Sequence, residues 1–321
     1  MRGEITPAVM AEAPVLRAAI GTYKHTMALK SGEAASGRLR LEFADVSPIN
    51  RAFGPMVRDG RFDVSEMAIA TFLQAKACGK PLVLLPVTLA ARFQESALLC
   101  RADSAIRGPA NLAGRRVGVR AYSQTTGMWL RGILAEDHSV SSDAVHWVTF
   151  EDAHVAECRD PPWAERAPAG ADMLAMLRAG DLDAVIVGND MPNDPGLRTV
   201  FPDPAAAGEA FRHRHGFMPV NHMVTVRSDL AESRPDLVAE LLRMFRHAKS
   251  AAPADAGARD LLPMGRAALQ PAIGLALRYS AEQGLLPRRL GADEVWEGLP
   301  HEDRSGPAAT REATGDTLET G

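Results

Sequence analysis

The sequence predicts an α/β protein whose two lobes face each other across a cleft. Short apolar runs alternate with segments of helical periodicity along the chain, which is typical of sheets covered by helices. At 321 residues the chain is long enough to form two hydrophobic cores. Two series of expected strands and helices follow one another, and an expected strand at residues 223–227 returns the chain to the first series.

The order of these elements divides the chain. We expect residues 15–100 and 224–300 to form the first lobe and residues 101–223 to form the second. The chain then crosses between the lobes twice, and small molecules bind preferentially in clefts between such units. Residues 301–321 contain little that could be buried, so we expect a disordered tail there.

Strands are expected where short apolar or alternating runs are bounded by polar, glycine or proline residues. In the first lobe they cover residues 15–21, 39–43, 61–64, 81–87 and the returning 223–227, and residues 97–101 are expected to form a crossing strand. Helices are expected where apolar residues recur three and four positions apart. They cover residues 48–59, 65–77, 235–251 and 269–283. Ser65 begins one of these helices, where its hydroxyl would cap the helix and bind an anion.

The second lobe contains the clearest indication of a ligand site. Its expected strands are residues 117–119, 145–150 and 182–187, and its expected helices are residues 127–134, 171–179 and 201–215. A polar loop joins the first strand to the first helix, and unpaired N–H groups at a helix N-terminus favour a bound carboxylate. The loop residues Tyr122, Ser123, Thr125 and Thr126 are therefore candidate substrate-binding residues, and ordinary helix capping is the structural alternative.

Composition and charge exclude several classes of function. Hydrophobic residues make up 46% and charged residues 24% of the chain, as in ordinary globular proteins. The net charge of −4 gives no support for nucleic-acid binding, and no block of like charge indicates a membrane surface. Cys78, Cys100 and Cys158 are odd in number and widely spaced, which argues against a disulfide framework and a cysteine-based metal site.

The N-terminal segment bears on localisation. Acidic residues and prolines interrupt residues 1–14 (MRGEITPAVMAEAP), whereas a secretory signal needs roughly seven or more uninterrupted apolar residues. No apolar run approaches the length of a membrane-spanning helix. We therefore expect a cytoplasmic protein with no membrane partner.

Several segments resemble one known family. They are FDVSEM (62–67), IRGPANLAGRRVGV (106–119), WLRGIL (129–134), GFMPVNHMVTVRSDLAE (216–232) and GLLPRRL (284–290). In this order they resemble the 4,5-dihydroxyphthalate decarboxylases, and the resemblance spans most of residues 18–290. That family has the fold of type II periplasmic solute-binding proteins without the export signal. The resemblance therefore implies this two-lobed α/β fold with its inter-lobe cleft.

The resemblance also implies a reaction. The family decarboxylates a hydroxylated aromatic carboxylic acid, 4,5-dihydroxyphthalate, to protocatechuate, and the chemistry can be written without a cofactor. A hydroxyl para to the leaving carboxylate pushes electrons into the ring, and a general acid protonates the carbon that bears the carboxylate. We expect the protein to bind a small aromatic carboxylate and no metal ion. Whether it forms a homo-oligomer is left open by the sequence.

Two segments depart from the family pattern. Phe93-Gln94-Glu95-Ser96 stands where the family carries Phe-Arg-His-Ser. Tyr122-Ser123-Gln124-Thr125 is shifted by one residue from the family's Tyr-Gln-x-Thr. Because the first change replaces a cation and a titratable ring where the cleft is expected, a changed substrate or a lost activity are open alternatives.

Two residues are candidates for acid catalysis. His222 is the first, because it lies beside the returning strand and an imidazole suits proton transfer at neutral pH. Its structural alternative is a histidine bonded to a backbone carbonyl. Glu66 is the second, provided that burial raises its pKa, and its alternative is a carboxylate at the start of a helix.

The candidate binding residues of the first lobe follow expected strands. Arg92 is the best candidate for a bidentate carboxylate clamp, with a surface ion pair as the alternative. The others are Tyr23, Lys24, His25, Ser65, Gln94 and Glu95.

Two classes of function fit this pattern. One is the decarboxylase, and the other is a non-enzymatic solute-binding protein or sensor for a small aromatic or organic anion. Both share the same lobes and cleft, so the fold does not separate them. A buried proton donor in the cleft favours the enzyme, whereas a cleft lined only by fixed hydrogen-bond donors favours the binding protein.

Overall fold

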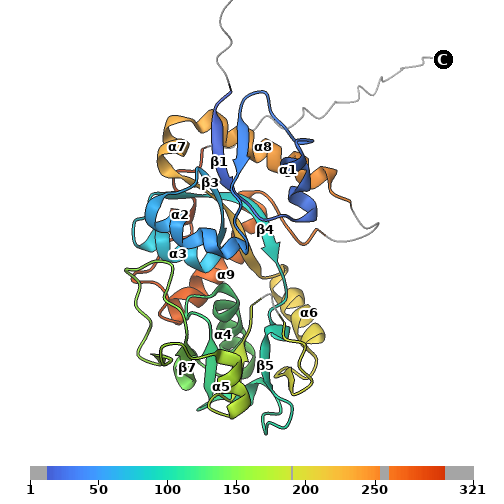
Figure 1. The fold of residues 1–321 in the computed structure, drawn as a ribbon, viewed down its shortest axis with the longest axis vertical. Helices are drawn as coiled ribbons and strands as arrows, with labels where there is room; N and C mark the ends of the chain where they lie inside the picture. The colour runs from blue at the N-terminus through green and yellow to red at the C-terminus, as the bar shows by residue number, and fades with distance from the viewer. Residues whose placement is uncertain (1–12, 189–190, 254–259, 301–321) are drawn as a thin grey trace, which may run out of the picture.

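The chain folds into two α/β lobes, one above the other in Figure 1. The structure is a computed structural model that describes residues 13–188, 191–253 and 260–300. Within these ranges each lobe has one mixed sheet, with strand order β2-β1-β3-β11-β4 in the first and β10-β5-β9-β6-β7-β8 in the second. The predicted two-lobed α/β architecture is therefore confirmed. The expected tail at residues 301–321 lies outside the described residues.

Helices cover both faces of the first sheet. Its strands are β1 (Val15–Ala19), β2 (Arg40–Phe43), β3 (Val64–Ala68), β4 (Leu82–Ala91) and β11 (Val220–Arg227). The helices of this lobe are α1 (Met27–Ser31), α2 (Phe53–Asp59), α3 (Ile69–Ala77), α7 (Ser228–Ser233) and α8 (Pro235–Ala251). Apolar residues of α8 pack on one face, and those of α2 and α3 belong to the hydrophobic core on the other. Near-continuous apolar strands are what such a doubly covered sheet requires.

The second sheet carries helices α4 (Thr125–His138), α5 (Met173–Ala179) and α6 (Pro204–His215). Its strands are β5 (Leu98–Arg101), β6 (Arg116–Val119), β7 (His146–Thr149), β8 (Ala164–Arg166), β9 (Ala184–Ile186) and β10 (Leu197–Thr199). Strand β6 pairs in parallel with both β7 and β9. The loop after β6 therefore lies at the carboxyl edge of parallel strands, where open α/β sheets bind ligands.

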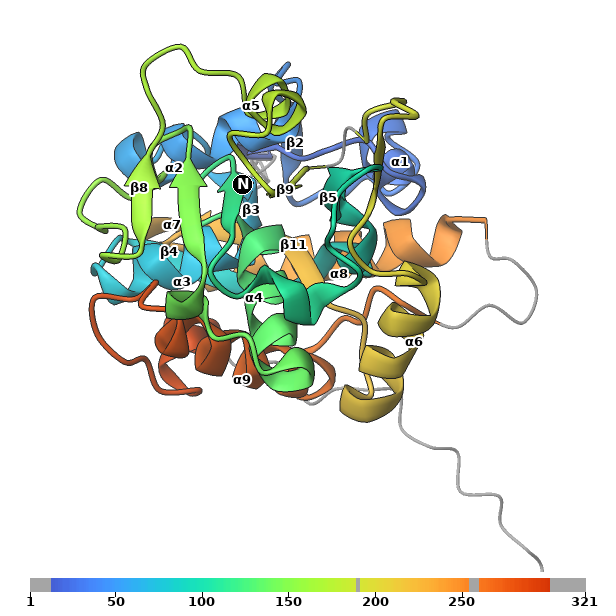
Figure 2. The same ribbon diagram turned by 90° about the horizontal axis from the view of Figure 1, so that it is seen from below.

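Helix α9 (Arg266–Glu282) joins the two lobes, because it packs against both α4 of the second lobe and α3 of the first (Figure 2). The contact with α4 is close at Gly132, where a Cβ atom would lie 2.0 Å from Cδ2 of Tyr279. A glycine is therefore needed on α4 for the two helices to approach this closely.

The chain crosses between the lobes beside the cleft. Strand β4 belongs to the first sheet and β5 to the second, and the later crossing runs from α6 to β11. The two crossing segments touch, because the Arg92 N–H donates to the Pro219 carbonyl at 3.1 Å. The lobe boundaries at residues 100 and 224 stay predictions.

The expected helix beginning at Ser65 is wrong. Residues Val64–Ala68 form strand β3 and are all buried, and α3 begins only at Ile69. Ser65 lies opposite Thr225 of β11, whose hydroxyl donates to the Ser65 carbonyl at 3.1 Å. Pairing with β11, more than 150 residues away in the sequence, overrides the local capping pattern. Ser65 therefore caps no helix.

Candidate functional site

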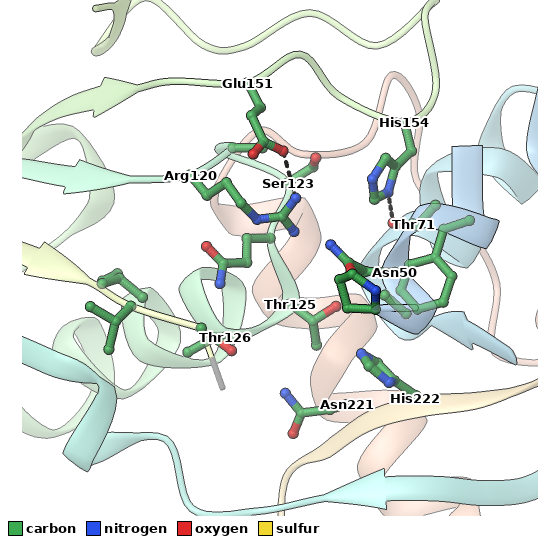
Figure 3. A pocket seen from close by; sticks show the side chains of 18 of the residues that line it. Asn50, Thr71, Arg120, Ser123, Thr125, Thr126, Glu151, His154, Asn221 and His222 are labelled. Carbon is green, nitrogen blue, oxygen red and sulfur yellow. Dashed lines mark hydrogen bonds and ion pairs between the residues drawn. The ribbon is translucent and has the colours of Figure 1, made fainter. Parts of the chain in front are cut away.

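A cavity of about 580 Å³ lies between the lobes (Figure 3). The first lobe contributes the loop after β1, the segment before α2, the start of α3 and the adjoining ends of β4 and β11. The second lobe contributes the loop before α4, the segment after β7 and the start of α5. Of the residues predicted for the site, Tyr23, Arg92, Ser123, Thr125, Thr126 and His222 line this inter-lobe cavity.

His222 lines the cavity from an irregular part of strand β11. The pairing of β11 with β4 shifts register on both sides of His222, and such irregularities redirect side chains next to functional sites. The His222 Nδ1 atom lies 2.7 Å from Oε1 of Glu66. With Nδ1–H donating to the carboxylate, the other ring nitrogen, Nε2, is left free of Glu66 for proton transfer to a bound molecule.

Glu66 is fully buried behind His222 on β3. Its carboxylate also accepts from the Tyr23 hydroxyl at 2.6 Å and from the Gly21 N–H at 2.9 Å. Burial by itself would raise the pKa of Glu66, but the hydrogen bond and charge of His222, together with those two donors, lower this pKa below its ordinary value. Glu66 is therefore ionised at neutral pH. The expectation of a raised pKa is wrong, and we assign Glu66 to positioning His222.

Arg92 extends into the cavity from the end of β4. One guanidinium NH₂ group donates to the Thr126 hydroxyl at 2.9 Å, and the other donates to the Gly188 carbonyl at 3.3 Å. Burial lowers the pKa of Arg92, and no carboxylate among the described residues forms an ion pair with it. A half-buried cation in this state gains most from an anionic ligand.

The two strand-to-helix turns meet at the floor of the cavity. The Thr125 hydroxyl, at the start of α4, accepts from the Ala70 N–H in the first turn of α3 at 3.2 Å. The N-cap residue of α4 is Gln124, whose side chain makes no capping hydrogen bond. Thr125 and Thr126 thus do not cap α4. The positive end of this 14-residue helix faces the cavity beside Arg92, and it favours negative charge there.

The structure adds a residue that the sequence analysis missed, His154 in the segment after β7. Its Nδ1 atom lies 3.2 Å from the Thr71 hydroxyl of α3. Phe53 packs edge-on against both His154 and His222, with ring centroids 5.9 and 5.1 Å apart respectively. Burial, with the nearby charges of Arg120 and Arg58, lowers the pKa of His154 to about 4.

Arg120 also lines the cavity, at its rim. Its guanidinium donates to Glu151 at 2.6 Å, and both side chains are partly exposed. The signal that could have identified Arg120 and His154 is their position after the carboxyl ends of β6 and β7. The proline-rich segment of residues 151–170, where the family resemblance is weakest, contains the second of them.

The other predicted site residues do not line the cavity. Lys24 is exposed, and His25 stacks against Tyr23, with ring centroids 5.3 Å apart, without lining the cavity. Ser65 is buried in β3. Tyr122 is also buried, and its hydroxyl donates to the Gln283 carbonyl at 3.0 Å. These four residues therefore do not contact a ligand in the cavity directly, as their predicted binding roles require.

Gln94 and Glu95, where the chain departs from the family pattern, lie behind the cavity wall. Both are buried, and the Gln94 side chain donates to Oδ1 of Asn221 at 2.8 Å. Asn221 itself lines the cavity next to His222. Burial raises the pKa of Glu95. Gln94 and Glu95 therefore do not form part of the cavity surface, and Gln94 acts on it only through its hydrogen bond to Asn221.

Comparisons with known proteins identify two similar sequences. No family model matches the chain. A 4,5-dihydroxyphthalate decarboxylase of Comamonas testosteroni is 29% identical over 250 residues, which are 74% of this chain and 75% of the relative. A second 4,5-dihydroxyphthalate decarboxylase, from Pseudomonas putida, is 29% identical over 53% of this chain and 69% of the relative. The chain resembles the 4,5-dihydroxyphthalate decarboxylases. The predicted resemblance is confirmed.

Solved structures show the fold of this decarboxylase-like chain. The alkanesulfonate-binding protein of Xanthomonas axonopodis pv. citri, bound to MOPS, matches with a TM-score of 0.57 at 15% identity, over 89% of this chain and 98% of that one. A putative periplasmic sulfonate-binding protein of Methylobacillus flagellatus KT matches with a TM-score of 0.52 at 11% identity, over 88% and 91%. The predicted periplasmic-binding-protein-like fold is confirmed. In the described ranges, every helix is too short or too polar to cross a membrane.

Proposed function

We propose that this protein is a carboxy-lyase that decarboxylates a hydroxylated aromatic carboxylic acid of the 4,5-dihydroxyphthalate type without a cofactor. The observation that carries the proposal is the pair formed by His222 and buried, ionised Glu66 at the wall of the inter-lobe cavity. The names of the two relatives supply the reaction type. Cytoplasmic location and a homo-oligomer remain predictions.

The pair supplies a proton donor of fixed orientation. A hydroxyl para to the carboxylate donates electron density to the ring, and Nε2–H of protonated His222 transfers its proton to the carbon that bears the carboxylate. The bond from that carbon to the carboxylate then breaks, its electrons restore the aromatic ring, and carbon dioxide leaves. Glu66 balances the positive charge of His222 while it carries the extra proton, and it holds Nδ1–H so that Nε2 faces the substrate.

The anion-binding groups would orient the substrate. Arg92 and the N-terminus of α4 lie together, so a carboxylate bound there would be held by a fork of N–H donors and by the helix dipole. In a dicarboxylic acid this would be the carboxylate that stays on the ring. When one carboxylate is fixed there, the other lies near the proton donor. Holding the reacting groups in this position accelerates the reaction.

The test is the release of carbon dioxide from a panel of hydroxylated phthalates and benzoates. We expect turnover by the wild type and its loss in His222→Asn, with binding retained in a thermal-shift assay of the same acids. His247→Asn, which changes an exposed histidine on α8, is the matched control and should keep full turnover. Tight binding of these acids by the wild type without any carbon dioxide release would refute the carboxy-lyase.

That last result would favour the second candidate, a solute-binding protein for a small organic anion. One observation supports it: the structures that share this fold include sulfonate-binding proteins, and Arg92 with the α4 N-terminus is an anion site without catalytic groups. A binding protein should have affinities that are unchanged by His222→Asn and lost in Arg92→Gln.

A further inference from the structure

The inter-lobe cavity has a second histidine whose chemistry differs from that of His222. We propose that His154, held by Thr71, binds a ring hydroxyl of the substrate and so selects hydroxylated aromatic acids over their hydroxyl-free analogues. This inference rests on the proposed function and assigns a specificity-determining residue to the same cavity. It concerns recognition by hydrogen bonding, with no proton transferred to His154.

The position of His154 is the first argument. Figure 3 shows His154 across the pocket from Thr126, the hydroxyl partner of Arg92, and on the same side as His222. Both imidazoles pack edge-on against Phe53, within 6 Å between ring centroids, and both line the cavity. An aromatic acid whose carboxylate is bound by Arg92 therefore directs the remainder of its ring toward the wall that holds the histidines.

The hydrogen-bonding state of His154 is the second argument. Nδ1 lies 3.2 Å from the Thr71 hydroxyl, which accepts from Nδ1 in one tautomer and donates to it in the other, so in both tautomers Nε2 is the ring nitrogen left for a ligand. A phenolic hydroxyl both donates and accepts, so it pairs with Nε2 in either tautomer, as donor to its lone pair or as acceptor from its N–H. The α3 helix holds Thr71 almost fully buried, so the partner that orients the His154 ring is itself fixed.

The charge of His154 is the third argument. Its low pKa, caused by burial and by Arg120 and Arg58, keeps the ring neutral at physiological pH. Arg92 carries a positive charge without an anionic partner among the described residues. The cavity thus offers an unpaired cation at Arg92, which suits a carboxylate, and a neutral imidazole at His154, which suits a hydroxyl. A neutral hydrogen-bonding site that loses its partner leaves a buried polar group unpaired, which is an effective way to reject an analogue.

The experiment compares the affinities of 4,5-dihydroxyphthalate and phthalate by isothermal titration calorimetry, with His222→Asn added to every protein so that the acid is not consumed during the titration. We expect the wild type to prefer the dihydroxy acid, and His154→Phe, which keeps an aromatic ring of similar shape, to lose this preference by about 10-fold or more. Thr71→Val, a nearly isosteric change that removes the partner of Nδ1, should lower the preference by about 3-fold. Arg92→Gln should weaken both acids alike and leave the preference unchanged.

Two outcomes separate this inference from the proposed function. If the wild type releases carbon dioxide from 4,5-dihydroxyphthalate but both His154→Phe and Thr71→Val keep the wild-type preference, the role of His154 is refuted and the carboxy-lyase stands. If the preference is lost in these variants while the wild type shows no turnover, the recognition by His154 stands and the carboxy-lyase is refuted. A wild type with equal affinity for the two acids also overturns the role of His154.

Discussion

The His222 imidazole and the Glu66 carboxylate form a pair across neighbouring strands, with 2.7 Å between Nδ1 and Oε1. They come from β11 and β3, which pair antiparallel, so two residues 156 positions apart in the sequence are held together. Because the carboxylate is fully buried and has two further donors, its position is fixed, and the orientation of the imidazole is fixed with it. Preorganised pairs of this kind are typical of acid–base catalysis.

Removing the charge of Glu66 should impair turnover more than binding. In Glu66→Gln we expect kcat to fall by about 100-fold or more with a much smaller change in KM, because the amide cannot hold Nδ1–H and balance a charged imidazole. Tyr23→Phe removes only one donor to the carboxylate, so it should cost about 10-fold. Steady-state kinetics on the best substrate measure kcat and KM of both variants, and circular dichroism checks that they are folded. A rise in KM without any fall in kcat in these variants would contradict a positioning role for Glu66.

Replacing Arg92 should strongly weaken the binding of a carboxylate. We expect Arg92→Gln to weaken binding by about 100-fold, and Arg92→Lys, which keeps the charge but loses the fork, to recover part of it. Arg120→Gln is the control, because Arg120 is already paired with Glu151 at the rim, and its effect should be several-fold smaller. Titration calorimetry with phthalate measures all three. Loss of affinity in Arg120→Gln equal to that in Arg92→Gln would show that the anion binds elsewhere.

The low pKa of His154 predicts how stability depends on pH. In the unfolded chain this histidine binds a proton near its ordinary pKa of 6.5, whereas in the folded protein it does so only near about 4. Between these values the unfolded state binds more protons, so the free energy of unfolding decreases as the pH falls from 6.5 toward 4. Because the ring is partly exposed, we expect this residue to contribute about 1 to 2 kcal/mol of that loss.

Urea unfolding at pH 7 and pH 5 tests this prediction in the wild type and in His154→Phe. The variant should lose less stability than the wild type between the two pH values, since its side chain does not titrate. His25, His138 and His215 also have lowered pKa values, but they are present in both proteins and cancel in the comparison. The same loss in both proteins would show that His154 is free to protonate in the folded state.

Two glycines in neighbouring helices should respond in opposite directions to alanine. At Gly132 of α4 a Cβ atom would overlap the Tyr279 ring of α9, so Gly132→Ala should lower the free energy of unfolding by about 2 to 3 kcal/mol. At Gly274 of α9 a Cβ atom would meet nothing within 4 Å, so Gly274→Ala should raise it by up to about 1 kcal/mol. Chemical denaturation of the two variants compares them directly. A stabilised Gly132→Ala would mean that α4 and α9 are not so closely packed.

The sequence by itself determined the local elements and the general chemistry of the site. Apolar runs and helical periodicity predicted β1, β4, α8 and α9, because these elements bury side chains in patterns set by their own repeat. The resemblance to the decarboxylases was also available in the sequence, through motifs such as FDVSEM. Arg92 and the loop before α4 were predicted for the site because they follow expected strands, and His222 because it lies beside the strand that returns the chain to the first lobe.

Only the tertiary structure decided the role of each side chain. Ser65 has the local signature of a helix cap, but the pairing of β3 with β11 places it in a buried strand. Whether burial or hydrogen bonds control the pKa of Glu66 depends on His222 and Tyr23, which approach it from other elements. His154 enters the cavity because its loop packs against α3 of the other lobe. Hydrogen bonds and charges act through space, so the groups that set each side chain's protonation and direction come from positions far apart in the chain.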